Sequence, residues 1–489
     1  MKQFLLSETM AWEISGGTLT ISGTGEMWDF DALSNNAPWL EESRKLIRKI
    51  IISEGVTNIG SWAFYGCSSL TSVIIPNSVT NIGRWAFYGC SSLTSITIPN
   101  SVMSIDGVFS GCKIEVDSEN SYYKSEDGVL FDKAMTTLIR CPERKQGEYV
   151  IPSSVTRIEE KAFLGCKYLT SITIPEGVTS IEGSAFSGCI SLTSIAIPSS
   201  VKNIGGYAFS NCSSLTSITI SNGVTSIGGR AFEDCSGLTS ISIPSSVTYI
   251  ENRAFYGCSG LTSIEVSSDN NNYKSKDGVL FNKAMTTLII CPAGKEGEYV
   301  IPSSVTSIEM GAFRSCSNLI SVVIPNGITS IGGGTFWGCS NLTSVVIPSS
   351  VTSIGNYAFS NCSSLKHIEF HSLFPPKATS YCCEKFFGID KIKCILYVPA
   401  KAVSAYKNDL HWRDFNNIFT IEEKASISLV KINFPQGSIV IKNAPVGETI
   451  DVYNEEGRLV GKQYVASPEI TIALPQGMYI VKIGNAIVK

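Results

Sequence analysis

The sequence predicts a mostly β repeat solenoid followed by a small C-terminal β-sandwich. A unit of 23 residues, clearest in segment 68–90, recurs along most of the 489-residue chain. A unit of this length cannot bury its own apolar face, so successive copies must stack and share one continuous core. Residues 426–489 instead alternate apolar and polar positions between turn-forming segments. That second pattern is typical of short antiparallel strands in a sandwich.

Residues 1–50 depart from the repeat and predict an N-terminal cap. The alternating segments 11–15 and 18–22 flank two glycines, which indicates a β-hairpin. We expect a short helix over residues 40–47. A cap of this kind covers the apolar end that the first rung of a solenoid would otherwise expose.

Residues 51–370 predict the solenoid itself, and its rungs share one pattern. A Leu and two Ile positions lead to a Pro, which predicts a short strand with its apolar side chains facing inward. A second apolar pair follows on the opposite side of the rung. An Ala-Phe-x2-Cys segment then predicts about one helical turn, with Phe and Cys on its inner face. The Phe recurs eleven times, at Phe64, Phe87, Phe109, Phe163, Phe186, Phe209, Phe232, Phe255, Phe313, Phe336 and Phe359.

Two insertions interrupt the period, at about 117–152 and 267–302. They are near copies of each other, and the repeated stretch begins DGVLF at Asp127 and again at Asp277. Each predicts a β-hairpin that re-enters the solenoid at a Tyr-Val-Ile-Pro segment. Insertions into repeats tend to lie on one face, often the binding face.

Residues 371–425 predict a C-terminal cap, and residues 426–489 a separate β-sandwich. In the cap we expect a last strand over 396–398 and a helix over 400–406. The sandwich follows from four or more short strands between Pro-x-Gly and Glu-Glu-Gly turns.

The 23-residue unit resembles the leucine-rich repeats of the BspA-like bacterial surface proteins, of the Treponema-type class, over about residues 51–370. The tail segments 452–454 (VYN), 456–460 (EGRLV) and 477–482 (GMYIVK) are similar to C-terminal sorting domains of type IX secretion in Bacteroidetes. The resemblance implies a right-handed leucine-rich-repeat superhelix, an extracellular or cell-surface location, and adhesion to host or bacterial proteins. The family shares no catalytic residues.

Charge and hydropathy exclude several classes of partner. The net charge of -4, without any run of Lys or Arg, argues against nucleic acid, which requires clustered basic charge. No segment approaches the roughly 18 to 20 apolar residues of a membrane-spanning helix. A secretory signal peptide is not visible in residues 1–9, whose apolar run is too short.

The cysteines and histidines indicate no metal site or cofactor. Eleven of the 16 cysteines share one repeat position, and we expect them to be buried free thiols that fill a tight corner. Cys141 and Cys291 should also be packed, whereas Cys382, Cys383 and Cys394 are the candidates for a disulfide. The three histidines lack a Cys-x2-Cys partner pair. Residues 269–272 should form a solvated turn, because the spacing of a calcium loop is missing.

The candidate binding residues are aromatic side chains that the repeat does not require. Trp62 and Tyr65 recur one rung later as Trp85 and Tyr88, so stacking should align them into one patch. Clustered exposed aromatic residues mark binding sites, although these four could instead pack under the N-terminal cap. Trp337 is a further candidate.

The sequence therefore predicts a non-enzymatic adhesion protein without a cofactor. Its partners would be extracellular or host proteins such as matrix components. The alternative is a carbohydrate-binding or scaffolding accessory protein of a surface nutrient-uptake system, in which aromatic platforms stack on glycan rings. The outward strand positions, mostly Ser and Thr, form either a solvated face or a shallow docking surface.

Overall fold

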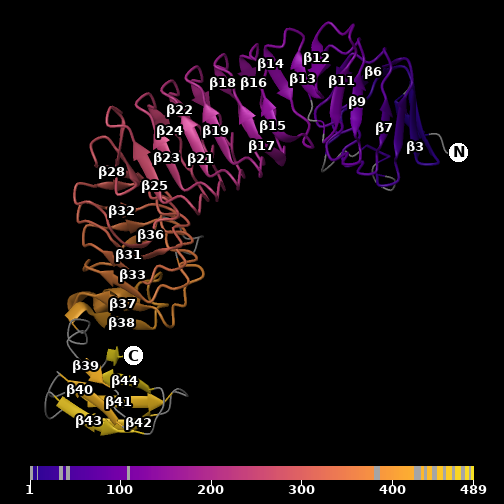
Figure 1. Cartoon of the computed structure of the whole chain (residues 1–489). Coiled ribbons are helices and arrows are strands. Elements are labelled where there is room, and N and C mark those ends of the chain that lie inside the picture. Colours follow the sequence, from indigo (N-terminus) through magenta and orange to yellow (C-terminus); the bar gives the residue numbers. More distant parts are fainter. Residues whose placement is uncertain are drawn as a thin grey trace. The chain divides into compact units, whose positions relative to one another are not determined.

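The computed structural model contains two compact units. The first comprises residues 1–283 and 292–294, and the second comprises residues 284–291 and 295–489. Within each unit, strands of successive rungs stack on one another (Figure 1). The structure describes residues 4–7, 9–31, 37–39, 44–106, 109, 111–378, 386–422, 431–433, 438–442, 449–454, 459–464, 469–474, 479–483 and 486–488.

The first unit opens with the predicted hairpin. Strand β1 (Phe4–Ser7) pairs antiparallel with β2 (Met10–Ser15), which pairs antiparallel with β3 (Thr18–Gly23). Strand β3 then pairs in parallel with β5 (Lys49–Ile52), so the cap extends the sheet of the solenoid. The helix expected over 40–47 is wrong for 44–47, because these residues form a turn that leads directly into β5; residues 40–43 lie outside the described part.

The longer strand of each rung pairs in parallel with that of a neighbouring rung. In β19 and β21, for example, Ile195 lies opposite Ile218. Their Ile residues are buried and the residues between them, Ser, Ala and Thr, are exposed, as the alternation predicts. After β5 the series in this unit is β7 (Ser72–Ile74), β9 (Ser95–Ile98), β11 (Lys113–Val116), β15 (Gln146–Val150), β17 (Tyr168–Thr173), β19 (Ser194–Ile197), β21 (Ser217–Ile220), β23 (Ser240–Ile243) and β25 (Ser263–Val266).

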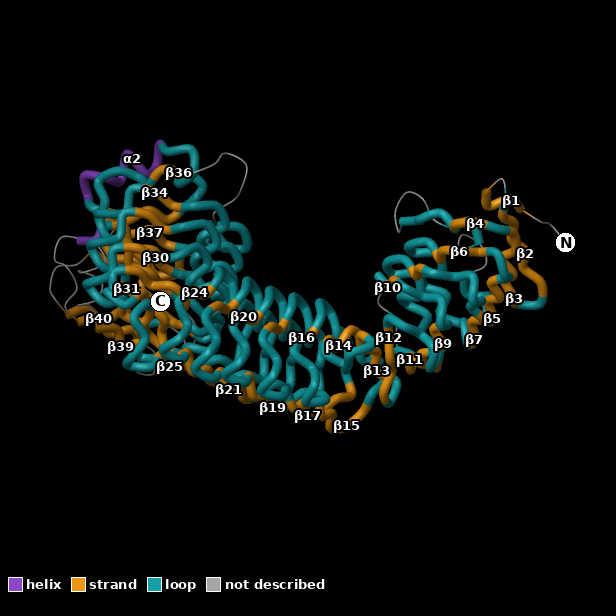
Figure 2. Tube along the Cα trace, turned by 90° about the horizontal axis from the view of Figure 1, so that it is seen from above, coloured by secondary structure: helices purple, strands orange, loops and turns teal. Residues whose placement is uncertain are grey.

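A second series of mostly two-residue strands lies on the opposite side of the rungs (Figure 2). These strands also pair in parallel, with Ile204 opposite Ile227 for example. Two sheets result, in the orders β10-β8-β6-β4 and β12-β13-β14-β16-β18-β20-β22-β24. The members of the series are β4 (Gly25–Glu26), β6 (Val56–Ile59), β8 (Asn81–Ile82), β10 (Ser104–Ile105), β16 (Arg157–Ile158), β18 (Ser180–Ile181), β20 (Asn203–Ile204), β22 (Ser226–Ile227) and β24 (Tyr249–Ile250).

Consecutive turns, and not a helical turn, carry the Phe and Cys of each rung. In the rung of Phe209, Tyr207 and Asn211 both adopt the left-handed conformation, with φ of 58° and 60°. Two such residues within five positions are incompatible with a right-handed helix. Phe209 nevertheless points inward as predicted and stacks on Phe186, with ring centroids 5.1 Å apart and an angle of 4°.

The cysteines form a ladder beside the Phe stack. Cys212 Sγ donates to the carbonyl of Phe186 in the preceding rung, at 3.2 Å, and Cys235 does the same to Phe209, at 3.1 Å. Both are free and fully buried. The prediction of buried thiols is confirmed, and each thiol adds a second hydrogen bond to a carbonyl that already accepts a backbone amide of its own turn. Cys394 is buried as well, whereas Cys382 and Cys383 lie outside the described residues.

The first insertion forms the predicted hairpin. Its strands are β12 (Tyr123–Glu126), β13 (Val129–Asp132) and β14 (Thr137–Arg140), and β14 pairs in parallel with β16 of the next rung. The buried side chain of Asn120 anchors the hairpin through four hydrogen bonds. Its Nδ2 donates to the carbonyls of Pro99 and Val102, and its Oδ1 accepts from two backbone amides.

The second insertion begins in the same way with β26 (Tyr273–Lys276) and β27 (Val279–Asn282), which pair antiparallel. Asn270 makes the four bonds that Asn120 makes in the first copy. The expectation of a solvated turn over 269–272 is therefore wrong for Asn270, whose side chain is fully buried. The Asn is required because it supplies two donors and an acceptor within one small side chain.

The second unit continues the same design. A six-stranded sheet carries the longer strands and a three-stranded sheet carries shorter ones, in the order β32-β34-β36. The longer strands are β29 (Gly297–Val300), β31 (Leu319–Val323), β33 (Ser344–Ile347), β35 (His367–Phe370), β37 (Ile395–Val398) and β38 (Asn417–Thr420). The strands of the second series are the four-residue β28 (Thr287–Ile290), which pairs with β30 (Ser307–Ile308), and the two-residue β32 (Ser330–Ile331), β34 (Ser353–Ile354) and β36 (Lys377–Ala378).

The C-terminal cap and the tail end this unit. The expected helix is present as η1 (Ala400–Ala402) and α2 (Val403–Asn408), with Tyr406 and Trp412 packed around Phe370. The tail forms two antiparallel sheets, ordered β39-β40-β43 and β42-β41-β44-β45. Its strands are β39 (Lys431–Asn433), β40 (Ser438–Lys442), β41 (Thr449–Asn454), β42 (Leu459–Tyr464), β43 (Glu469–Ala473), β44 (Tyr479–Ile483) and β45 (Ala486–Val488).

Candidate functional site

Trp62 and Trp85 occupy a special position of the turn. Their φ angles are 60° and 62°, in the left-handed region that bulky residues rarely adopt. The equivalent position, two residues before the Phe, is Gly311 or Gly334 in later rungs and is left-handed there too. Six other rungs carry a residue other than Gly at this position with the same positive φ (Lys161, Ser184, Tyr207, Arg230, Arg253 and Tyr357). The conformational cost of about 1 kcal/mol is therefore common to most rungs and is not specific to the two indoles.

The four predicted aromatic residues form one cluster, which we call the aromatic patch (Trp62, Tyr65, Trp85 and Tyr88). The two indoles stack with centroids 5.8 Å apart, and the two phenol rings stack at 5.8 Å and 7°. Within each rung the indole meets the phenol edge to face, at 4.9 Å in one and 4.7 Å in the next. The structure thus brings together the residues that the repeat spacing predicted to align.

All four rings of the aromatic patch are half-buried. Trp62 and Tyr65 pack against the buried core of the first rungs. The rings are therefore anchored on one side and exposed on the other. Their partial exposure contradicts complete burial beneath the N-terminal cap and leaves a contact surface.

Three basic side chains surround the aromatic patch. The guanidinium of Arg44 lies 5.7 Å from the Tyr65 ring centroid, and that of Arg84 lies 5.9 Å from Trp85. Lys161 Nζ, which comes from the rung after the first insertion, lies 5.5 Å from Trp85. Such cations are attracted to the negative face of an aromatic ring. The sequence did not reveal this rim, because Lys161 is distant from Trp85 along the chain.

Trp337 belongs to the second unit and is considered by itself. It is half-buried, and the guanidinium of Arg314 lies 4.1 Å from its ring centroid. It repeats the pairing of an aromatic residue with a cation but has no second indole in the next rung, where Ser360 takes its place.

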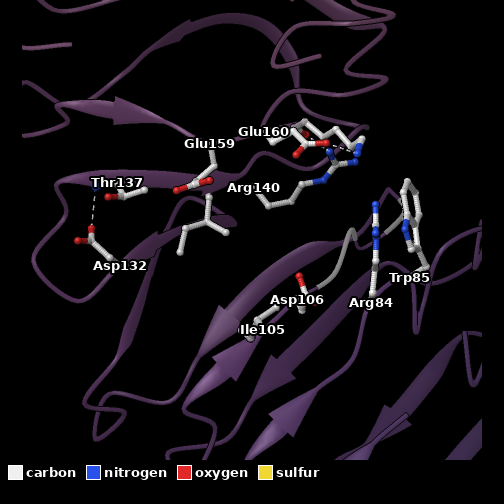
Figure 3. Close-up of a pocket in the computed structure, with 11 residues that line it drawn as sticks. Arg84, Trp85, Ile105, Asp106, Asp132, Thr137, Arg140, Glu159 and Glu160 are labelled. Carbon is white, nitrogen blue, oxygen red and sulfur yellow. Dashed lines mark hydrogen bonds and ion pairs between the residues drawn. The ribbon is translucent and has the colours of Figure 1, made fainter. Parts of the chain in front are cut away.

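A pocket of about 550 Å³ borders Trp85, between β10 and the hairpin strand β14 (Figure 3). Eleven residues line it, and only Trp85, Ile105 and Ile139 are apolar. Arg84 and Trp85 stand on one wall, and Arg140 and Glu160 on another. The volume lies within the range of small-molecule sites, about 300–1,000 Å³. No sequence motif pointed to this pocket, because its lining comes from four separate segments.

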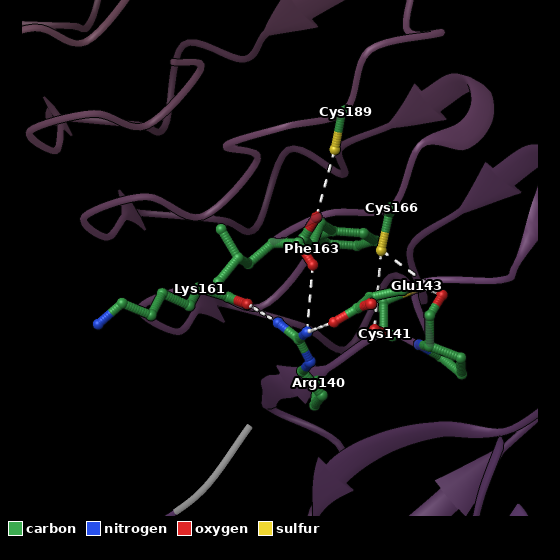
Figure 4. A network of polar contacts seen from close by, with 9 residues as sticks. Arg140, Cys141, Glu143, Lys161, Phe163, Cys166 and Cys189 are labelled. Atoms are coloured by element: carbon green, nitrogen blue, oxygen red, sulfur yellow. Dashed lines mark hydrogen bonds and ion pairs between the residues drawn. The ribbon is translucent and has the colours of Figure 1, made fainter. Parts of the chain in front are cut away.

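Arg140 forms a buried polar network at the back of the pocket (Figure 4). Its side chain is 2% exposed and pairs with Glu143, with Nη2 3.0 Å from Oε1. The same guanidinium donates to the carbonyls of Leu164, at 3.1 Å, and Lys161. Burial raises the pKa of Glu143, and the charge of Arg140 opposes that rise. This network fixes the hairpin to the next rung.

The described residues contain no group of three or more His, Cys, Asp or Glu side chains arranged to hold a metal ion. The buried cysteines are unsuited to nucleophilic or metal chemistry, because burial raises the thiol pKa of Cys67 and of Cys112 to about 12 and thiolate is the reactive form. In the part of the chain that the structure describes, no helix is long and apolar enough to cross a membrane.

Comparison with known protein families agrees with the repeat structure. The family model described as BspA type leucine rich repeat region matches six copies, over residues 42–123, 143–262 and 296–400. The chain belongs to the BspA-type leucine-rich-repeat family. A second model, a domain of unknown function (DUF6383), matches residues 420–489. A search of curated proteins gives no match.

Several solved structures are similar to this BspA-type chain. A leucine rich cell surface protein from Faecalibacterium prausnitzii is 25% identical, with 86% of this chain and 95% of that chain covered and a TM-score of 0.43. A leucine-rich repeat protein from Eubacterium ventriosum is 24% identical, with 86% and 84% covered and a TM-score of 0.33. The pneumococcal vaccine antigen PcpA is 17% identical, with 85% and 98% covered and a TM-score of 0.40.

Proposed function

We propose that this BspA-type protein is a non-enzymatic adhesion protein, exposed on the cell surface or secreted. It binds extracellular or host proteins, such as matrix components, through the surface of its solenoid. The aromatic patch is the main contact site, and Trp337 is a secondary contact in the second unit.

The observation that carries this proposal is the departure of two neighbouring rungs from the others. At the positions of Trp62 and Trp85 the other rungs carry Gly, Ser, Lys, Arg or Tyr, whereas these two neighbouring rungs both carry an indole. At the positions of Tyr65 and Tyr88 the other rungs carry Ser, Leu, Glu, Tyr, Arg or Trp, so the fold does not prescribe a phenol in two successive rungs. Because the fold does not require four rings at these positions, we attribute their clustering to binding.

The physical character of the aromatic patch suits a protein partner. Trp, Tyr and Arg dominate the energetics of protein interfaces, and the patch combines four rings with Arg44 and Arg84. Stacking on the neighbouring ring holds each side chain in one orientation. Binding would therefore require little ordering of side chains, which favours affinity.

The test uses a variant whose new residues all come from other rungs of this chain. In this rung-exchange variant, Trp62 and Trp85 become Gly, as in Gly311, and Tyr65 and Tyr88 become Ser. Binding of the full chain to immobilised fibronectin, fibrinogen, laminin and collagen is measured by surface plasmon resonance. We expect at least a hundredfold weaker binding to the recognised protein, because an interface anchor contributes about 2 kcal/mol or more.

A matched control makes the same exchanges elsewhere in the first unit. Tyr207→Gly alters the same left-handed position, and Tyr256→Ser alters the position of the phenols. This control should bind as the unaltered chain does. Equal affinity of the rung-exchange variant and the control would show that the aromatic patch is not the main contact site.

We further propose that the repeats belong to the Treponema-type class and that residues 426–489 are a type IX sorting domain. The support is the 23-residue period and the similarity of the tail segments described above. In the native cell the protein should then be found outside the cytoplasm, with the tail cleaved after about residue 425. Fractionation with mass mapping of both termini tests this, and an intact tail on cytoplasmic protein would contradict it.

A further inference from the structure

We infer that the pocket beside Trp85 is a binding site for an uncharged sugar ring within a glycan. This inference goes beyond the protein-binding role proposed above and concerns different residues, apart from Trp85 and Arg84, which border both sites. It assigns the alternative function, carbohydrate binding, to one site, where β10 adjoins the first insertion.

Two of the charged side chains that line the pocket already stabilise the fold. Asp132 accepts from the backbone amides of Thr136 and Thr137 and from the Thr136 hydroxyl, each at 2.7 Å. Its carboxylate therefore stabilises the turn of the hairpin. Arg140 is likewise committed to Glu143 and to two carbonyls. These two residues define the walls of the pocket and are not assigned to a ligand.

Two further acidic groups are paired with basic ones. Glu160 forms an ion pair with Lys161, and Glu159 pairs with Arg157 at 3.2 Å. Arg84 and Asp106 are different, because neither side chain has a hydrogen-bond or ion-pair partner among the described residues, and both are exposed. They stand with Trp85 on the same side of the pocket (Figure 3).

The chemistry of these three residues selects a class of ligand. Asp106 accepts hydrogen bonds and Arg84 donates them, and both do so through planar groups with two adjacent polar atoms. Trp85 lies beside Arg84 and adds an apolar ring to the lining (Figure 3). A sugar ring carries adjacent hydroxyls that both donate and accept, and a C–H face that packs on an indole. The arrangement therefore matches a sugar better than a purely apolar or purely ionic ligand.

The balance of charge argues that the sugar is neutral. The pocket is lined by three basic residues (Arg84, Arg140 and Lys161) and four acidic ones (Asp106, Asp132, Glu159 and Glu160). Such a lining offers no net positive field to an anionic glycan or to an acidic peptide. Hydrogen bonds to a neutral ligand also depend little on salt, unlike ion pairs.

The duplication within the chain shows that the fold does not require the binding groups. The corresponding positions of the second copy keep Thr287, Ile289 and Glu309, which match Thr137, Ile139 and Glu159. In contrast, the positions equivalent to Arg84, Trp85 and Lys161 are Gly229, Arg230 and Gly311. Asp132, Arg140 and Glu160 are also replaced, by Asn282, Ile290 and Met310. The second insertion therefore folds without the set of Arg84, Trp85 and Lys161, so the fold of the junction does not require these three residues.

The test is an array of neutral and acidic oligosaccharides, followed by calorimetric titration of the full chain with the best neutral binder. The double variant Arg84→Gly, Asp106→Asn should weaken binding about tenfold or more, through the loss of two polar contacts. The first of these residues is already Gly in the second copy. Raising NaCl from 0.05 to 0.5 M should change Kd less than about twofold.

The controls separate this inference from the adhesion proposal. Tyr65→Ser removes a ring of the aromatic patch that does not line the pocket; it should weaken protein binding and leave the glycan titration unchanged. The Arg84 and Asp106 double variant should weaken glycan binding even if no protein partner is found. Three results would each overturn the inference: no neutral glycan bound, an unaltered Kd in the double variant, or binding only to acidic glycans with strong dependence on salt.

Discussion

Removing the Asn120 side chain should release the first insertion from the solenoid. Asn120→Ala deletes two bonds to carbonyls, at 2.8 and 3.0 Å, and two bonds from the amides of Tyr122 and Tyr123, both at 2.8 Å. The side chain is fully buried, so water does not readily replace it. The carbonyl of Pro99 still accepts from the amide of Val102, so three groups are left unpaired. At about 1 kcal/mol for each, the expected loss is about 3 kcal/mol.

The loss should be local, because each rung of a solenoid contacts only its neighbours. We therefore expect faster hydrogen exchange in residues 117–140 while rungs beyond the junction keep their protection. Asn270→Ala should give the same result in the second insertion, since its four bonds measure 2.8, 2.9, 2.8 and 2.8 Å. Hydrogen exchange followed by mass spectrometry measures both variants.

The adjacent residue provides the control. Asn271 is exposed, and Asn271→Ala should leave exchange rates unchanged. If Asn270→Ala and Asn271→Ala gave the same exchange rates in the second insertion, the side-chain bonds would contribute little, and the assignment of Asn270, and with it Asn120, as the anchor of its hairpin would be refuted.

Three further predictions concern the core and the aromatic patch. Phe209→Ala opens the ring stack between Phe186 and Phe232 and should lower the stability of that rung by about 3–5 kcal/mol, seen as loss of exchange protection there; unchanged protection would contradict the role of the stack. Burial raises the pKa of Cys67, Cys112 and Cys258 from 9.0 to about 12. Each protonated thiol therefore makes its full contribution to the free energy of unfolding below pH 9. That contribution falls by up to about 1.4 kcal/mol per pH unit as the pH rises toward 12. Urea midpoints at pH 8–11 should show this decline, less steeply after all three are replaced by Ala, and equal slopes would count against it. Trp62→Gly should be about 1 kcal/mol more stable than Trp62→Ala, because Gly adopts a φ of 60° without cost; thermal melts of both variants compare them, and a more stable Ala variant would show that the position is not strained.

The sequence predicts the solenoid because its signals are local and repeated. Strand alternation, the Pro that follows it and the inward Phe and Cys occur in rung after rung, so each confirms the others. The alignment of Trp62 with Trp85 followed from the same periodicity. That alignment requires only that neighbouring rungs stack in register. The pairing of Ile50 with Val73 shows that they do.

The features that the sequence did not predict depend on conformation or on distant segments. A left-handed residue at Tyr207 converts the expected helical turn into consecutive turns, and no residue type at that position announces it, since Trp, Lys, Ser, Tyr and Arg all occur there. The buried role of Asn270 was hidden among three similar polar neighbours. The pocket was hidden because Arg84 and Lys161 come together only after the first insertion has folded.

The most direct test of the account is the affinity of the rung-exchange variant for the extracellular protein that the unaltered chain binds most tightly. Circular dichroism and thermal melting first establish that the variant is folded. We expect this because other rungs carry Gly and Ser at the same positions. We expect a Kd at least a hundredfold higher for this variant and an unchanged Kd for the Tyr207→Gly, Tyr256→Ser control. A folded variant that binds as tightly as the unaltered chain would contradict the claim that the aromatic patch is the binding surface.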